Sequence, residues 1–469
     1  MICFGTGGWR AVIGDDFTRE NIQRATAGIL AYMKETDRTK LPVPVGYDRR
    51  FLSVAAAKWI AEVLTAGGVQ VLFMPRSVPT PMIMHTVLDR KLWFGIEVTA
   101  SHNPSEYNGI KLIVEEGRDA PLEVTNRIEE LIEEVETIPR LPFEEAVRTG
   151  AVTYIKKPFD RFMDSIVSQL DMKALREDGP RVLFDCMHGS GVFPLQVIFH
   201  AAYCTIDTIN ENRDAFFGGK VPAPSENTLQ TLKNEVLAGN YDLGLAMDGD
   251  GDRLGVIDAN GAYVGANEIL CMLYWYLHEY KGWRGPVVRN LATTHMLDRI
   301  AEDLGEVCYE VPVGFKYISS KIDEVDAVLG GESSGGLTVR GHIHGKDSIY
   351  ASLLFAEMMA VTKRTPSEIM ADFRARYGDY VMVEDNLRFT ADCKAAIYKT
   401  VFEDKKLPDF GVEITRVNYE DGCKVYFADN SFVICRFSGT EPLLRIFAEG
   451  SSASVASGYI SAFKQFLGL

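Results

Sequence analysis

Three aspartates alternate with glycines in the run LGLAMDGDGDRLGVID, and this pattern is suited to binding a metal ion. Asp248, Asp250 and Asp252 follow an apolar segment that is typical of a strand. In an extended backbone, residues two apart project to the same side, so the three carboxylates can converge. Because converging carboxylates repel one another, a hard divalent cation with oxygen ligands is their natural partner. The run therefore predicts a metal site, with a solvated acidic turn as the alternative.

The same spacing begins an EF-hand calcium loop, but the rest of that loop is missing. Its sixth position is Arg253 rather than glycine, and its twelfth is Ala259 rather than glutamate. An EF-hand is therefore excluded.

A second reactive stretch, TASHNPSEYNGIK, spans residues 99–111 and follows the apolar run LWFGIEV. Ser101 is a candidate nucleophile or phosphate carrier, His102 a candidate proton handler, and Lys111 a positive charge for the reacting oxygen. The same residue types also suit a turn or a helix cap. The metal site favours the reactive interpretation, since a phosphorylated serine would offer a further oxygen to the cation. As a base, His102 starts from a pKa of ~6.5, whereas Lys111 starts from ~10.4 and would need a lowered value.

Three other stretches suit the binding of phosphates or sugars. RFSGTEPLLRIFAEG combines Arg436 with the hydroxyls and amides of a Ser-Gly-Thr turn, which suits a phosphate cradle or a plain tight turn. GGESSGG carries Glu332 and Ser334, which can bond to sugar hydroxyls, although such loops are also common connectors. FGTGGWR is no P-loop, but Arg10 within it could stabilise an oxyanion.

Three segments of similar pattern must carry these loops. Residues 43–73, 181–209 and 285–311 each read as a strand, a polar or glycine-bearing loop, a helix and a second strand, as in a βαβ unit. In α/β sheets the ligand binds beyond the carboxyl ends of the strands, where the loops above are expected to lie. The last ~90 residues alternate differently and predict an α+β domain. The pattern restarts give the predicted domain boundaries, which are 1–155, 156–262, 263–375 and 376–469.

Composition restricts the class of protein. The chain has 469 residues, of which 46% are hydrophobic and 24% charged, and it lacks an uncharged apolar run of about 18 residues, so a soluble multidomain protein without a membrane span is expected. The N-terminal sequence does not resemble a secretory signal, so we expect a cytoplasmic location. The net charge of −16 argues against nucleic acid and anionic membranes as partners. The eight cysteines form no C-x-x-C pair and predict neither zinc nor a disulfide framework.

The motifs TASHNP, DGDGDR, GESSG and SGTEP, in this order, resemble those of the α-D-phosphohexomutase family, which comprises phosphoglucomutases, phosphomannomutases and phosphoglucosamine mutases. The resemblance runs from FGTGGWR to RFSGTEPLLR, nearly the whole chain. It implies four domains around a central cleft, the first three being similar α/β units and the fourth a C-terminal α+β domain. This architecture suits the repeated pattern above.

The resemblance also implies roles for individual residues. Ser101 matches the serine that is phosphorylated in the active enzyme, and with Asp248, Asp250 and Asp252 it would bind one Mg²⁺ per chain. Arg10 and Lys111 match residues that assist proton transfer, beside His102. The residues implied to bind the substrate are Arg253, Lys316, Glu332, Ser334, His342, Arg436, Ser438, Gly439 and Thr440.

The implied function is a Mg²⁺-dependent phosphohexomutase that interconverts hexose 1-phosphate and hexose 6-phosphate, with glucose 1,6-bisphosphate as activator. Many relatives read G-E-x-S-G-H where this chain has Gly336, and the familiar K-D-G is KDS here, so the preferred sugar stays open between glucose, mannose and glucosamine. A phosphoglucosamine mutase is the alternative within the family. Outside it, a non-catalytic phosphosugar sensor and a phosphatase are the alternatives, and the oligomeric state is open between monomer and dimer.

Overall fold

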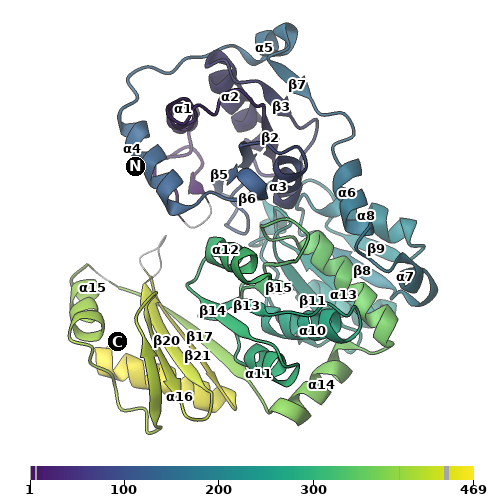
Figure 1. The fold of residues 1–469 in the computed structure, drawn as a ribbon, viewed down its shortest axis with the longest axis vertical. Coiled ribbons are helices and arrows are strands. Elements are labelled where there is room, and N and C mark those ends of the chain that lie inside the picture. Colours follow the sequence, from purple (N-terminus) through teal and green to yellow (C-terminus); the bar gives the residue numbers. More distant parts are fainter. Residues whose placement is uncertain (1, 6–7, 390, 438–442) are drawn as a thin grey trace. The chain divides into compact units, whose positions relative to one another are not determined.

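The computed structural model of the chain describes residues 2–5, 8–389, 391–437 and 443–469 (Figure 1). They form two compact units, of which the first comprises Met1–Ile269 and Ser334–Ser367 and the second Leu270–Ser333 and Glu368–Leu469. Within the described ranges, no helix combines the length and the hydrophobicity that a bilayer crossing requires.

The first unit begins with a seven-stranded sheet in the order β1-β5-β4-β2-β3-β7, with β6 paired to β5. Strand β2 is parallel to β3 and β4, whereas β5 runs antiparallel to β4. Every residue of β4 is buried, as expected for a central strand with both faces covered. The strands are β1 (Trp9–Val12), β2 (Val43–Tyr47), β3 (Val71–Phe73), β4 (Phe94–Val98), β5 (Tyr107–Val114), β6 (Arg118–Asp119) and β7 (Val152–Tyr154).

Five helices accompany this sheet: α1, α2, α4 and α5 share its hydrophobic core, and α3 packs against β4 and β2. The first starts where the hydroxyl of Thr18 accepts a hydrogen bond from the backbone N–H of Asn21, a usual N-cap. The helices are α1 (Arg19–Glu35), α2 (Ser53–Ala66), α3 (Thr80–Asp89), α4 (Leu122–Glu133) and α5 (Phe143–Thr149), with a short 3₁₀ turn η1 (Glu115–Gly117).

A second sheet of the first unit has the order β12-β11-β10-β8-β9, with β10 parallel to β8 and antiparallel to β11. Its strands are β8 (Val182–Asp185), β9 (Ile206–Ile209), β10 (Leu243–Met247), β11 (Leu254–Asp258) and β12 (Tyr263–Val264). The helices of this part are α6 (Asp160–Val167), α7 (Met172–Asp178), α8 (Val192–Ala201), η2 (Phe217–Gly219) and α9 (Gln230–Gly239). Strand β16 (Leu337–Val339) and helix α13 (Ser348–Thr362) complete the unit, and α13 packs on α7 and α8.

The second unit contains the parallel strands β14, β13 and β15, in that order. The elements are β13 (Val287–Asn290), α11 (Met296–Asp303), β14 (Cys308–Val311), α12 (Phe315–Val325) and β15 (Leu329–Gly331). The chain passes between the two units within helices α10 (Ala266–Glu279) and α14 (Pro366–Tyr377) and again between Ser333 and Ser334.

The end of the second unit is an antiparallel sheet in the order β17-β21-β20-β19-β18, packed against helix α16 (Figure 1). Its elements are β17 (Val381–Arg388), α15 (Ala391–Ile397), the π-helical turn η3 (Tyr398–Glu403), β18 (Ile414–Asn418), β19 (Cys423–Phe427), β20 (Phe432–Phe437), β21 (Leu443–Gly450) and α16 (Ala453–Leu467). This is the α+β domain that the sequence predicts.

A buried lysine joins this last sheet to the parallel strands of the same unit. The Nζ of Lys424, on β19, donates to the backbone oxygen of Leu291 at 2.7 Å and to Glu310 Oε2 at 2.6 Å, and lies 3.0 Å from His295 Nε2. Burial and, to a lesser extent, the charge of Arg289 lower the pKa of Lys424 to about 7, although Glu310 opposes the shift.

This lowered pKa predicts how stability depends on pH. In the unfolded chain Lys424 regains a pKa near ~10.4, so between about pH 7 and 10 the unfolded state binds more protons and stability rises with pH. The free energy of unfolding of the wild type, minus that of Lys424→Met, should rise by up to about 1.4 kcal/mol per pH unit in this window. Urea unfolding at several pH values measures the difference, with Lys464→Met, at a half-buried ion pair with Asp385, as control. A flat difference would contradict the prediction.

Candidate active site

Ser101 lies just beyond the carboxyl end of β4 in an unusual backbone conformation. Its φ is +50°, a region that only a few per cent of non-glycine residues adopt. The backbone N–H donates to Thr99 Oγ1 at 2.8 Å, and the residue is buried. Such strain persists only where the surroundings impose it, and it is frequent at functional sites.

A fully buried arginine holds the loop around Ser101. Arg50, which follows β2, lies 3.3 Å from Asp48 Oδ2 through its Nε. Asp48 also accepts from the hydroxyl of Thr99, the group that bonds to the N–H of Ser101. The Nη atoms of Arg50 donate to the backbone oxygens of Ser101 (2.6 Å), Asn103 (2.5 Å), Pro104 (2.8 Å) and Tyr107 (3.1 Å). One guanidinium thus fixes four carbonyls of the loop.

The three aspartates follow β10 directly and converge as expected, but they do so through a turn and not through the alternation of an extended strand. Asp248 Oδ1 accepts from the backbone N–H groups of Asp252 at 2.9 Å and Arg253 at 3.1 Å, so the loop folds back on its first residue. One oxygen from each carboxylate lies within 4.8 Å of the others. Within the described part of the chain, Asp250 Oδ1 and Asp252 Oδ1 are buried without a hydrogen-bond partner. This donor set fits a divalent cation with oxygen ligands.

The serine loop and the aspartate loop meet directly. Ser101 Oγ donates to Asp248 Oδ2 at 2.8 Å. A Cβ at Gly249 would lie 2.8 Å from the backbone oxygen of Ser101, so only glycine allows this approach without a shift. The reactive hydroxyl therefore lies against one of the three candidate metal ligands.

Two lysines and a threonine surround the other two carboxylates. Lys111, on β5, donates to Asp250 Oδ2 at 2.7 Å and to Asp252 Oδ2 at 2.8 Å. Lys346 lies 3.1 Å from Asp252 Oδ2, and the hydroxyl of Thr80, at the start of α3, donates to Asp250 Oδ2 at 2.6 Å. These donors offset the charge that burial would otherwise make unfavourable.

The pKa shifts follow from this arrangement. Burial, with Asp250 and Asp252 adding to it, raises the pKa of Asp248 well above its usual value. Burial acts in the same direction on Asp252, but Lys111 and Lys346 outweigh it and hold the pKa of Asp252 well below its usual value. For Lys111, burial is outweighed by Asp250 and Asp252, which raise the pKa above the usual value for lysine. Lys111 is therefore a fixed positive charge in this state.

His102 belongs to the serine loop, and its ring is affected by the charges of Arg10 and Arg253. His102 Nδ1 lies 3.4 Å from Ser101 Oγ. Burial, then Arg253 and Arg10, lower the pKa of His102 far below its usual value, so the expectation of titration near neutrality is wrong for this geometry. The ordinary value assumes a solvated ring without cationic neighbours. Arg10 Nη1 donates to Asn103 Oδ1 at 2.6 Å, and Arg253 Nε lies 3.9 Å from Asp252 Oδ1.

The segment 334–348 lies in the same unit as these loops. The backbone N–H of Leu254 donates to the oxygen of Gly335, which fastens the residue next to exposed Ser334 to the end of the aspartate loop. His342 is buried, and its Nε2 lies 2.7 Å from Asp347 Oδ2, so this nitrogen is engaged within the protein.

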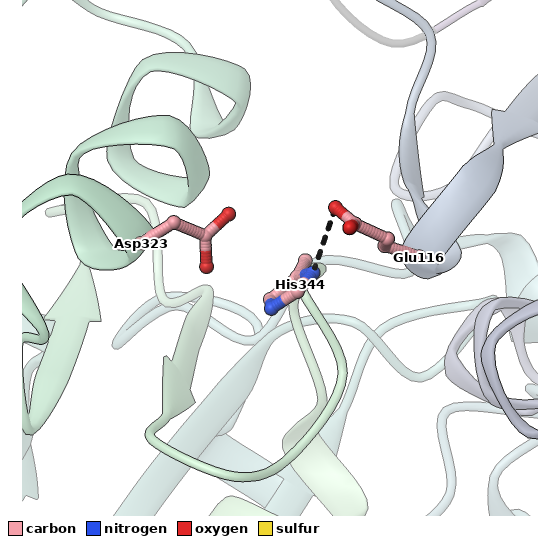
Figure 2. A group of neighbouring side chains, drawn as sticks. All are labelled: Glu116, Asp323 and His344. Atoms are coloured by element: carbon pink, nitrogen blue, oxygen red, sulfur yellow. Dashed lines mark ion pairs between the residues drawn. The ribbon is translucent and has the colours of Figure 1, made fainter.

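The segment 334–348 also contacts residues of η1 and β6. His344 Nδ1 lies 4.0 Å from Glu116 Oε2, the ion pair drawn in Figure 2, and 3.1 Å from Arg118 Nη2. His342 and Lys346 are therefore carried on a segment that is attached at several points.

The remaining candidates belong to the second unit. Half-buried Lys316 lies in the first turn of α12, with its Nζ 5.2 Å from the centre of the Tyr317 ring. Glu332 is buried and accepts from Asn290 Nδ2 at 3.3 Å. Arg436, near the end of β20, lies 3.1 Å from Asp421 Oδ1. Ser438, Gly439 and Thr440 lie outside the described residues.

Sequence reasoning missed several residues of the site. Asp48 and Arg50 could have been found, because YDRR follows a predicted strand at its carboxyl end, where ligands bind in α/β sheets. Lys346 reads as a solvated surface charge in the sequence, and Thr80 carries no local signal. Their contacts depend on how distant segments come together.

Comparisons with known proteins cover almost the whole chain. Four sequence models of phosphoglucomutase/phosphomannomutase match in order: alpha/beta/alpha domain I over residues 1–138, domain II over 160–261, domain III over 265–377 and the C-terminal domain over 384–464. The four-domain α/β architecture expected from the sequence is thereby confirmed.

Curated relatives and solved structures agree with these matches. A phosphoglucomutase/phosphomannomutase of Thermococcus kodakarensis is 28% identical over 97% of this chain and 96% of its own length. A phosphoglucosamine mutase of Pseudomonas putida is 28% identical over 99% of this chain and 98% of its own length. A crystal structure from Thermus thermophilus, described as a phosphomannomutase, is 28% identical and covers 100% of this chain and 99% of its own, with a TM-score of 0.86.

The role of Arg50 can be tested by replacing it with lysine. Lysine keeps the charge opposite Asp48 but cannot reach four carbonyls, and each unsatisfied buried acceptor costs roughly 1–3 kcal/mol. Arg50→Lys should therefore lower the free energy of unfolding by about 3 kcal/mol or more. Urea unfolding measures this loss. Arg49→Lys is the matched control, since Arg49 donates to one backbone oxygen, that of Glu211, and should lose less than about 1 kcal/mol. Equal losses would contradict the prediction.

Proposed function

The chain belongs to the phosphoglucomutase/phosphomannomutase family, and we propose that it is a Mg²⁺-dependent mutase interconverting hexose 1-phosphate and hexose 6-phosphate, with glucose or mannose as the hexose. That it is an isomerase of the phosphohexomutase kind follows from the mutases to which it is similar. One observation carries the proposal: the hydroxyl of Ser101 bonds to Asp248, 147 residues away, within a cluster of three buried carboxylates. Such a meeting of a hydroxyl with a metal-binding site suits phosphoryl transfer.

Asp248, Asp250 and Asp252 are the proposed ligands of one Mg²⁺ per chain, with an oxygen of phosphorylated Ser101 as a further ligand. The unpartnered oxygens of Asp250 and Asp252 support this assignment. When bound, the ion offsets negative charge on the phosphoryl oxygens during transfer.

The proposed reaction has two transfers. Phosphorylated Ser101 gives its phosphoryl group to the free hydroxyl of the sugar phosphate: a new P–O bond forms to the sugar oxygen while the P–O bond to Ser101 breaks. The sugar hydroxyl loses its proton to a protein group, and the departing Ser101 oxygen takes up a proton. The sugar 1,6-bisphosphate then turns around and its other phosphoryl group passes to Ser101: the P–O bond to the sugar breaks as a P–O bond to Ser101 forms, the serine hydroxyl loses its proton and the sugar oxygen gains one. Glucose 1,6-bisphosphate is the proposed activator, because it can phosphorylate Ser101 in enzyme molecules that do not yet carry a phosphoryl group.

The cations around Ser101 have a common task. Lys111, Arg10 and Arg253 surround the transferring group with positive charge, and phosphoryl transfer depends mainly on such positioning and charge. His102 lies beside the Ser101 oxygen and, with Arg10, is a proposed participant in proton movement. Lys111 keeps its proton while it faces Asp250 and Asp252, so it is proposed to move a proton only once it has left these carboxylates.

The other sequence candidates are proposed to hold the sugar and its non-reacting phosphate. Glu332, Ser334 and Lys316 are proposed to contact sugar hydroxyls, with His342 beside them. Because His342 Nε2 faces Asp347, a sugar contact by His342 would have to use its other ring nitrogen or require movement. Arg436 is proposed to bind the non-reacting phosphate together with Ser438, Gly439 and Thr440.

Phosphoglucosamine is the alternative substrate, supported by the relative from Pseudomonas putida. Gly336 and the KDS sequence, which depart from the family pattern, lie where sugars would be distinguished. We further propose a cytoplasmic enzyme without nucleic acid or membrane as partner, acting as a monomer or a dimer.

A direct assay tests the proposal. With Mg²⁺ and a trace of glucose 1,6-bisphosphate, the protein should convert α-glucose 1-phosphate to glucose 6-phosphate, measured with a coupled dehydrogenase. Ser101→Ala should reduce the rate by a factor on the order of 10⁴ or more, because the phosphate carrier is lost. Ser105→Ala, in the same loop, is the matched control and should retain the wild-type rate.

The other outcomes separate the alternatives. Faster turnover of glucosamine phosphate than of glucose or mannose phosphate would assign the phosphoglucosamine mutase. Release of inorganic phosphate without isomer formation would indicate a phosphatase. Binding of phosphosugars without turnover of any of them would favour a sensor and refute the proposed reaction.

A further inference from the structure

Glu97, the last but one residue of β4, carries a buried carboxyl group. Its exposed fraction is 0%, and neither carboxyl oxygen has a hydrogen-bond partner among the residues that the structure describes. The neighbouring strand leaves space for it, since a Cβ at Gly46 would lie 2.2 Å from Glu97 Oε2. Buried unpaired carboxyl groups are costly, so a group of this kind needs an explanation.

The residue opposite Glu97 is Lys111. The two are register partners in the antiparallel pair of β4 and β5, and directly opposite residues share a face with Cβ atoms about 5 Å apart. The four-carbon stem of lysine can cover this separation. Burial raises the pKa of Glu97 well above its usual value, Asp48 and Asp250 add to the shift, and Lys111 is the cation that opposes it. The ammonium group of Lys111, however, lies on Asp250 and Asp252.

A divalent cation would change the balance at Lys111. Bound through the free oxygens of Asp250 and Asp252, it would share two carboxylates with the ammonium group. At an effective dielectric constant of 20, unit charges about 4 Å apart interact by about 4 kcal/mol, and a doubly charged ion doubles this repulsion. Lys111 therefore needs a second anionic partner, away from the aspartates, when the cation is bound.

We propose that Glu97 is this partner: a positioning residue that takes the ammonium group of Lys111 when the three aspartates hold a divalent cation. The inference rests on the metal site of the proposed function. In the metal-free state Lys111 neutralises the aspartates and Glu97 carries no charge; with the cation bound, Lys111 turns to Glu97, which ionises against it. The row Gly46, Glu97, Lys111 across three neighbouring strands provides the space and the reach.

Asp119, on β6, is the competing candidate. Its Oδ1 is also buried without a hydrogen-bond partner in the described ranges. Burial raises the pKa of Asp119, and the charge of Lys111 opposes this shift. Lys346 also lowers the pKa of Asp119, whereas Lys111 is the cation that lowers the pKa of Glu97. Asp119→Asn is therefore the matched control for Glu97→Gln, since each change removes one buried carboxyl group near Lys111.

The test is the affinity for Mn²⁺ alone, measured by electron paramagnetic resonance of the free ion without sugar. Mass spectrometry ensures the same phosphorylation state of Ser101 in all variants. Glu97→Gln should weaken Mn²⁺ binding by about tenfold, a typical coupling between contacting residues. In a Lys111→Met background the same change should have no effect, because no ammonium group needs a partner. Glu97→Met serves as a second variant, with the same expectation, should the glutamine variant fail to fold.

Each other outcome refutes the proposal. Unchanged affinity in Glu97→Gln and Glu97→Met, or an equal loss in the Lys111→Met background, would show that Glu97 does not act through Lys111. A loss in Asp119→Asn with none in Glu97→Gln would assign the role to Asp119 instead. The absence of saturable Mn²⁺ binding to the wild type would refute the metal site itself, whereas normal wild-type binding with unaffected variants would refute only the role of Glu97.

Discussion

Mutual repulsion among three buried carboxylates is the constraint on which the rest of the site depends. At separations below 5 Å and an effective dielectric constant of 20, each pair of unit charges costs about 3 kcal/mol. In this structure Lys111, Lys346 and Thr80 offset this repulsion, because they bring positive charge and hydrogen-bond donors from three other segments. The packing of β5, α3 and the segment before α13 is therefore tied to the charge of one short loop.

Rigid strands below the loops make this charge balance possible. The serine loop leaves β4, the aspartate loop leaves β10, and the Asp48–Arg50 pair leaves β2, all at carboxyl ends. Arg50, which directly follows the strand β2, fixes the serine loop, because its planar guanidinium donates to four backbone oxygens at once. The left-handed conformation of Ser101 is maintained by these bonds and not by local sequence preference.

How much the sequence predicts depends on whether a signal is local. Ser101 and the three aspartates could be found because spacing and flanking apolar strands carry their signal, and the α/β class follows from the repeated strand and helix pattern. Thr80, Lys346 and Glu97 could not be identified in this way, because their roles arise from contacts with residues far along the chain. The low pKa of His102 could not be predicted either, since it depends on burial and on the cations around the ring. The domain boundaries and the phosphate-gripping turn at 438–440 stay predictions.

The two compact units do not follow the order of the chain, because residues 334–367 return to the first unit after the second has begun. Helix α13, which packs on α7 and α8, emerges from the ribosome only after β13–β15 and α12. During synthesis the first unit therefore cannot complete its folding, and part of its apolar surface stays uncovered, until more than three quarters of the chain has been made. Folding of this protein is consequently not a sequence of independent domain events, and a fragment that ends before α13 would be exposed to aggregation.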